Sequence, residues 1–154
     1  MRLKNYITLN ELFDSNVPIK LDFKDDEKDY TWYNYEFKID KIPYEFASTY
    51  NKEDDILDIE FTGDGDFSIT NTGNALKVFS AVKKCLIDNL KIMKKENGTI
   101  PNSIRFEADV DEPSRVKLYN RFMKVLPKVL KDYKFDKKET VFGTKMYKFS
   151  KKGR

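Results

Sequence analysis

The stretch that decides the fold is SIRFEADVDEPSRVKLYNRFMKVL, residues 103–126. Apolar and polar residues alternate from Ile104 to Ala108, which is the pattern of a strand with one buried face. An acidic turn follows, and Pro113 suits the first turn of a helix, where its missing N–H costs no hydrogen bond. Apolar residues then recur every three or four positions, at Val116, Tyr119, Phe122, Met123 and Leu126. The stretch therefore predicts a strand, a tight turn and an amphipathic helix that carries Tyr119 on its apolar side.

The length and composition predict a single folded domain, residues 1–154, with a substantial core. Hydrophobic residues make up 40% of the chain, so 36% charged residues do not make it disordered. The chain has 29 Lys and Arg residues and 26 Asp and Glu residues, so its net charge is +3, and residues of both signs are interspersed along the sequence. This balance disfavours a dedicated nucleic-acid binder.

The chain has one cysteine, Cys85, and no histidine. This excludes a disulfide within the chain, a zinc site of Cys and His ligands, and catalysis by a histidine base. We expect no metal site, and we interpret Cys85 as a small core residue on an apolar helix face. No apolar run reaches the length of a membrane span, and no signal-peptide core is present at the N-terminus. We therefore expect a cytoplasmic protein that binds no membrane.

Periodicity predicts the remaining elements. A capping-box pattern at residues 8–11 predicts a short helix over residues 8–15. Alternation predicts strands over residues 17–23 and 56–61 and a hairpin of residues 31–39 and 43–49. The longest helical pattern runs from Leu76 to Met93 and ends at Gly98. Pro127 is expected to stop or kink the next helix near Leu126, and residues 133–140 and 144–149 predict a final hairpin.

This order predicts a mixed α/β (α+β) fold: antiparallel strands lead into a right-handed β-α-β crossover, with helices packed on the sheet. Two interpretations exist for the aromatic residues of the first hairpin, Trp32, Tyr33, Tyr35 and Phe37. They could form a platform on which bases stack, or they could pack in the core and across strands. We favour packing, because the chain has no basic-aromatic motif of an RNA-binding sheet.

Residues 66–75, DFSITNTGNA, connect a strand to the longest helix and also allow two interpretations. Small residues and free N–H groups at a helix start can hold a phosphate. Alternatively, Thr72 or Asn74 caps the helix and Gly73 makes the turn, which is the commoner role of such residues.

The chain resembles the GNAT superfamily of N-acetyltransferases over residues 56–149. The family's phosphate loop, Arg/Gln-x-x-Gly-x-Gly/Ala, is matched at Gly73 and Ala75, whereas Thr70 replaces the Arg or Gln. The segment from Ser114 to Tyr119 is similar to a second pattern of the family, Asn/Ser-x-x-x-Leu-Tyr. The sequence EPSRVKLYNR also resembles a stretch of small phage proteins, which points to a phage-encoded protein in the host cytoplasm.

The resemblance implies a fold with a mostly antiparallel sheet, a β-α-β-α core and a C-terminal hairpin. It implies transfer of an acyl group from acetyl-CoA to an amine, which could belong to a protein or a small molecule. The end of the strand over residues 56–61 would bind the pantetheine. Tyr119 would be the general acid, and Glu60 or Glu107 the base by position. The residues that would bind the cofactor are Thr70, Thr72, Gly73, Asn74, Ala75 and Ser114.

The chain departs from the family in its N-terminal part. Members usually have two helices between the first two strands, and these helices shape the acceptor site. Here only residues 8–15 predict a helix in that part of the chain. A second interpretation is therefore a catalytically inactive protein of the same fold that binds another protein, as a phage accessory or anti-host factor. A third is a structural phage protein.

Overall fold

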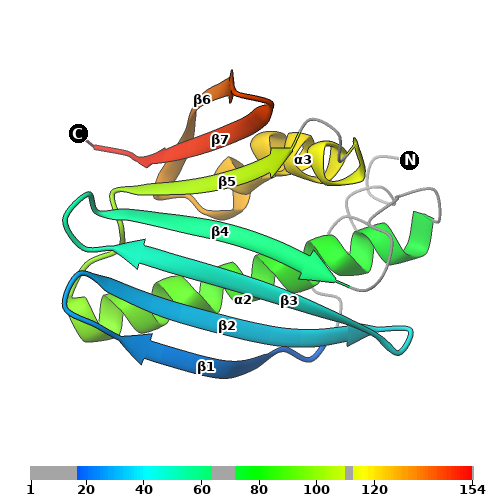
Figure 1. Ribbon diagram of the computed structural model, residues 1–154, viewed down its shortest axis with the longest axis horizontal. Helices are drawn as coiled ribbons and strands as arrows, with labels where there is room; N and C mark the ends of the chain where they lie inside the picture. Colours follow the sequence, from blue (N-terminus) through cyan, green and yellow to red (C-terminus); the bar gives the residue numbers. More distant parts are fainter. Residues whose placement is uncertain (1–16, 64–71, 110–112, 154) are drawn as a thin grey trace.

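The computed structural model describes residues 17–63, 72–109 and 113–153, and for some helix positions among them only the backbone (Figure 1). Within these residues, seven strands form one sheet in the order β1-β2-β3-β4-β5-β7-β6. The strands are β1 (Lys20–Asp26), β2 (Tyr30–Ile39), β3 (Ile42–Asn51), β4 (Ile56–Gly63), β5 (Ser103–Asp109), β6 (Tyr133–Val141) and β7 (Thr144–Lys151). Two helices accompany them, α2 (Thr72–Asn97) and α3 (Pro113–Val129).

All neighbouring strands are antiparallel except β4 and β5, which are parallel and are connected through α2. A parallel pair needs such a crossover because the chain must return to the same end of the sheet. After β5 comes α3, and the hairpin of β6 and β7 follows. The predicted fold class is confirmed: a mostly antiparallel mixed sheet, a β-α-β-α core and a C-terminal hairpin.

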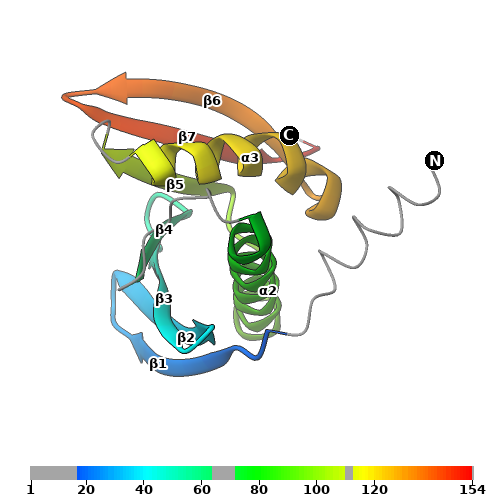
Figure 2. The same cartoon turned by 90° about the vertical axis from the view of Figure 1, so that its right-hand side faces the viewer.

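Both helices lie on the same side of the sheet (Figure 2). The ring of Phe79 on α2 lies 4.7 Å from that of Phe122 on α3, and Phe122 packs on Phe106 of β5 at 5.3 Å. Each central strand turns one set of alternate residues toward these helices, and those residues are buried. The other side, which we call the open face, is covered by no helix among the described residues.

The aromatic hairpin of β2 and β3 shows this division clearly. Tyr33, Tyr35 and Phe37 are buried under α2, whereas Trp32 lies on the open face and is 37% exposed. The core interpretation is confirmed for the three buried rings. Trp32 is the one aromatic residue of these four that is not buried in the core.

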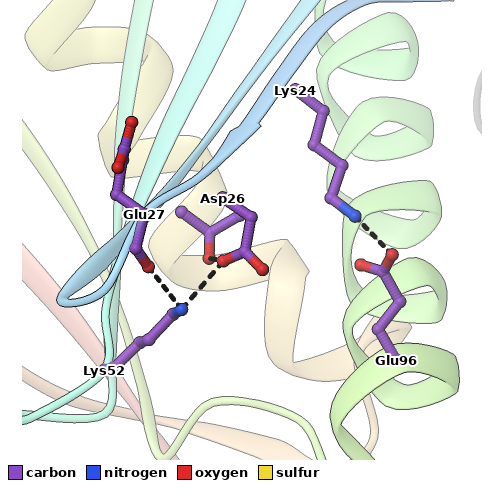
Figure 3. A network of polar contacts seen from close by, with 6 residues as sticks. Lys24, Asp26, Glu27, Lys52 and Glu96 are labelled. Atoms are coloured by element: carbon purple, nitrogen blue, oxygen red, sulfur yellow. Dashed lines mark hydrogen bonds and ion pairs between the residues drawn. The ribbon is translucent and has the colours of Figure 1, made fainter.

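Charged side chains attach the edge strand β1 to its neighbours (Figure 3). Lys24 makes an ion pair with Glu96 near the end of α2. Lys52 Nζ lies 2.8 Å from Asp26 Oδ1 and donates to the carbonyl of Glu27 at 2.5 Å. Lys52, followed by a hydrogen bond from Thr31, holds the pKa of Asp26 below its ordinary value. These contacts tie the turn between β1 and β2 to the end of β3.

The strand predicted over residues 17–23 is shifted: β1 begins at Lys20 and continues to Asp26. Val17 is buried instead as part of the core, and its carbonyl accepts a hydrogen bond from Lys84 of α2 at 2.8 Å. The charged residues beyond the predicted end, Lys24, Asp25 and Asp26, also pair with β2, because an edge strand can keep charged side chains in water. The helix predicted over residues 8–15 lies outside the described residues.

Of the two outcomes expected near Leu126, a stop or a kink, the stop does not occur, because α3 passes through Pro127 to Val129. Pro127 lacks the N–H that would donate to the carbonyl of Met123, and α3 ends at Val129, soon after this lost hydrogen bond. The N–H of Leu130 still donates to the carbonyl of Leu126 at 2.7 Å. Neither α2 nor α3, in the part described, is long and apolar enough to span a bilayer.

Candidate functional site

The parallel strands β4 and β5 separate part-way along their length. Their pairing runs only from Ile56 opposite Ser103 to Ile59 opposite Phe106. Beyond that point β4 stays paired with β3 as far as Gly63, and β5 stays paired with β7 as far as Asp109. The backbone groups that β4 and β5 turn toward each other are therefore not bonded between them here. Figure 1 shows the two strands diverging toward their C-terminal ends.

The N-termini of both helices lie at the end of the sheet where the strands separate (Figure 1). Helix α2 follows β4 and begins at Thr72, and α3 follows β5 and begins at Pro113. A helix N-terminus carries unpaired N–H groups and the positive end of the helix dipole, so it favours an anion. Neither helix has an acidic residue in its first turn that would occupy this end. The strand separation thus lies beside two helix N-termini, of which that of α3 directly follows Asp111 and Glu112 in the sequence.

Glu60 and Glu107 are the first residues of β4 and β5 after their mutual pairing ends. Both alternate with buried residues, so both lie on the open face. Glu60 is exposed and has no ion-pair partner among the residues described. Glu107 Oε1 lies 3.9 Å from Arg105 Nε. The structure therefore brings these two predicted candidates together on one side of the strand separation.

Tyr119 lies on the other side of the sheet, where α3 packs on β5. Its side chain is fully buried, with ring centroids 5.2 Å from Phe106 and 5.9 Å from Tyr147. Phe106 is the last residue of β5 that pairs with β4. Through Phe106, Tyr119 therefore packs near the point where β4 and β5 separate. Tyr119 lies on the helix side of the sheet, whereas Glu60 and Glu107 lie on the open face.

The predicted phosphate loop is described only in part. Thr70 lies outside the described residues. The backbone of Thr72, Gly73, Asn74 and Ala75 forms the first turn of α2, and Ser114 is the second residue of α3. Their backbone lies at the end of the sheet where the strands separate, and their roles in binding a cofactor stay predictions.

Sequence reasoning missed a cross-strand ion pair next to the site. Arg105 donates to Asp58 through Nε at 2.6 Å and through a terminal nitrogen at 3.0 Å. This contact, ahead of an opposing effect of burial, raises the pKa of the Arg105 guanidinium. Asp58 and Arg105 stand opposite each other in the parallel register. The alternation of apolar and polar residues in each strand predicts which face Asp58 and Arg105 lie on. It does not predict that they pair, because α2 separates their two strands in the sequence.

Cys85 is fully buried on α2, and burial raises the pKa of its thiol above the ordinary value. A thiol that resists ionisation is a poor nucleophile. The interpretation of Cys85 as a core residue is confirmed.

No family model matches the chain, and no curated protein matches it. Among solved structures, it is similar to a mutant of the spermidine N-acetyltransferase SpeG from Vibrio cholerae, with 9% identity and a TM-score of 0.43 over 96% of this chain and 72% of that one. Two chimeras of that enzyme with hSSAT match at 10% identity and TM-scores of 0.41, over 96% of this chain and 72% and 74% of theirs.

None of these three structures is that of a phage protein, so the predicted phage origin has no support from them. The fold and the candidate site described above rest on the chain's own strand order and contacts.

Proposed function

We propose that this protein binds an acyl-coenzyme A and transfers the acyl group to an amine. The observation that carries the proposal is the separation of β4 from β5 immediately after Ile59 and Phe106, beside the N-termini of α2 and α3. Strand edges with free backbone groups can pair with the amides of a pantetheine arm. A helix N-terminus suits a pyrophosphate.

Each part of the cofactor has a counterpart in the chain. The pyrophosphate would lie at the start of α2, against the backbone from Thr70 to Ala75. The pantetheine would pair with the part of β4 that β5 leaves. A backbone N–H there would hydrogen-bond the thioester carbonyl and stabilise the negative charge that develops on its oxygen.

The acceptor amine would approach from the open face. Glu60 or Glu107, directly or through a water molecule, takes a proton from the ammonium group. The free amine attacks the thioester carbon, the tetrahedral intermediate collapses, and the C–S bond breaks. The leaving thiolate would accept a proton from Tyr119 on the helix side, and the nitrogen of the new amide would release its remaining extra proton to water. Tyr119 would regain a proton from solvent, so that the amide, free coenzyme A and one released proton are the products.

One observation favours the second candidate, an inactive protein of this fold that binds another protein. The Tyr119 side chain is fully buried against Phe106 and Tyr147, which is how a core tyrosine packs. In that case Tyr119 stabilises the protein and has no contact with a thiolate.

The substitution Tyr119→Phe tests whether Tyr119 acts as the general acid or only packs in the core. If Tyr119 protonates the thiolate, loss of its hydroxyl should lower turnover by about a hundredfold, the lower range for general acid catalysis, and leave acetyl-CoA affinity unchanged. Thiol release measures turnover, and titration calorimetry with acetyl-CoA measures affinity. The matched control is Tyr147→Phe, since that buried hydroxyl bonds Asn120 at 2.9 Å and has no assigned catalytic role. Absence of acetyl-CoA binding to the unmodified protein at millimolar concentration contradicts the proposed function.

A further inference from the structure

A groove lies on the helix side of the molecule, at the end of the sheet opposite the strand separation. It is bounded by the C-terminal half of α2 and by the connection from α3 to β6, and its volume is about 350 Å³. Its apolar lining comes from Ile87 and Leu90 of α2, from Ile100, and from Val129 and Leu130. This volume is within the range of sites that bind small molecules.

Hydrogen bonds fix one wall of this groove. The helix α3 ends at Val129, and the N–H of Tyr133 donates to the carbonyl of Leu130 at 3.0 Å, so the chain turns sharply into β6. The Tyr133 side chain is buried, and its hydroxyl donates to the carbonyl of Pro101 at 2.5 Å. The groove is therefore built into the fold, and a ligand can enter it without a movement of α3.

Positive charge surrounds the apolar lining. Lys91 and Lys94 of α2 and Lys131 of the connection line the groove. All three lysines are exposed, and none makes an ion pair or a hydrogen bond with any residue that the structure describes. Asp132 is the one acidic residue of the described lining, so positive charges outnumber negative ones. The groove therefore favours an anion.

The lysines of α2 are not explained by the helix alone. Lys94 is in the last turn, where a cation interacts favourably with the helix dipole, but Lys91 lies before that turn. The two lysines are three residues apart, a spacing at which like charges destabilise a helix. The acidic residues nearby are engaged elsewhere: Tyr35 donates to Asp88 at 2.8 Å, and Glu96 pairs with a lysine of β1 (Figure 3). An anion bound at Lys91 would relieve this repulsion.

We propose that the groove binds a carboxylate with an apolar chain, which is the chemistry of a fatty acid. The chain lies along the apolar lining, and the carboxylate lies between Lys91 and Lys131, which come from opposite walls. Among the described residues of the lining, no side-chain amide or free hydroxyl is present to bind a sugar or a base, because the Tyr133 hydroxyl is already bonded. The site does not rest on the proposed acyl transfer, which is assigned to the other end of the sheet.

Titration calorimetry of the unmodified protein, without coenzyme, tests the site with octanoate, decanoate and dodecanoate below their micelle concentrations. Affinity should rise by up to about fourfold for each added methylene group, the factor that corresponds to burial of one such group. Decanol has the same chain as decanoate and no charge, so it should bind several-fold more weakly. Added salt should weaken the binding of decanoate but not of decanol.

Substitutions locate the bound carboxylate. Lys91→Gln should weaken decanoate about threefold. The matched control is Lys95→Gln, which makes the same change one turn further along α2 and outside the groove, and it should not weaken binding. Ile87→Glu places a carboxylate in the apolar lining and should abolish decanoate binding, with an unchanged circular dichroism spectrum to show that the variant folds.

Affinity that does not depend on chain length, or equal binding of decanoate by the Lys91 and Lys95 variants, overturns the site. Competition between decanoate and acetyl-CoA would place the fatty acid at the strand separation, and this also overturns it. A dimer that Ile87→Glu dissociates, in a protein that binds no decanoate, overturns the proposal and assigns the groove to a second copy of the chain.

The two proposals fail separately. Decanoate binding that Lys91→Gln weakens, in a protein that does not bind acetyl-CoA, contradicts the proposed function and supports the groove. Acetyl-CoA binding and turnover in a protein that binds none of the fatty acids overturns the groove and supports acyl transfer.

Discussion

Ser48 of β3 and Asn89 of α2 form a buried polar pair that joins the sheet to the long helix. The Ser48 hydroxyl donates to Asn89 Oδ1 at 2.5 Å, and both side chains are buried. Asn89 Nδ2 has no partner among the residues that the structure describes. The amide therefore depends on Ser48 for the one hydrogen bond that compensates part of its burial.

The substitution Ser48→Ala should lower the free energy of unfolding by about 1–3 kcal/mol, because it leaves the buried Asn89 carbonyl oxygen without a donor. Urea unfolding followed by circular dichroism measures this. The control is Ser150→Ala, whose hydroxyl bonds Asp136 at 2.7 Å at the surface, where water can replace it. Equal losses of unfolding free energy in the two variants would show that burial of the Ser48–Asn89 hydrogen bond adds nothing to stability.

Residue patterns alone showed which side chains are buried but not what they touch. The recurrence of apolar residues every three or four positions predicted Tyr119 on the apolar side of α3, and the structure confirms that its side chain is buried. Its neighbours Phe106 and Tyr147 come from β5 and β7, and no local pattern connects these positions. The same holds for Asp58 and Arg105, which meet only through the register of β4 and β5.

At the scale of elements, the hairpin of β2 and β3 has an unfavourable turn. Asp40 and Lys41 are its two central residues, and both have positive φ, 52° and 69°. Two positive φ values in a two-residue loop are typical of a type I′ turn, which favours Asn or Asp followed by Gly. Lysine at the second position carries a Cβ that disfavours this conformation.

Lys41→Gly should therefore raise the free energy of unfolding by about 0.5–1 kcal/mol, since it relieves the strained φ at an exposed position. Thermal or urea unfolding measures the change. Lys38→Gly is the matched control: it replaces an exposed lysine within β2 and should destabilise the hairpin by a similar amount. A loss of stability in Lys41→Gly would contradict a type I′ turn at this position.

At the scale of the whole molecule, the buried Tyr33 and the partly buried Tyr50 link stability to alkaline pH. Burial, followed by the charges of Glu96 and Asp26, raises the pKa of Tyr33 from 10.0 to about 12. Burial and a hydrogen bond to Asp55 raise the pKa of Tyr50 to about 12. Because these pKa values are higher in the folded state, their contribution is complete below pH 10.0 and is lost as the pH rises through about 12.

We therefore expect the protein to unfold in base between these two pH values, with tyrosinate absorbance and loss of circular dichroism changing together. Replacement of Tyr50 by Phe should reduce the stability lost over this pH range without changing its limits, because Tyr33 titrates over the same range. Complete tyrosine ionisation with intact circular dichroism would contradict the burial of these hydroxyls.

The sequence by itself determined the order of the elements, the buried side of each strand and the fold class, because alternation and helical periodicity are local. It also placed Glu60 and Glu107 toward the C-terminal ends of their strands and Tyr119 on the apolar side of the helix that follows. Only the tertiary structure decided where β4 and β5 separate, which face no helix covers, and that Asp25 lies beside Trp32. These features depend on the register between strands, which long-range packing sets and local periodicity does not encode.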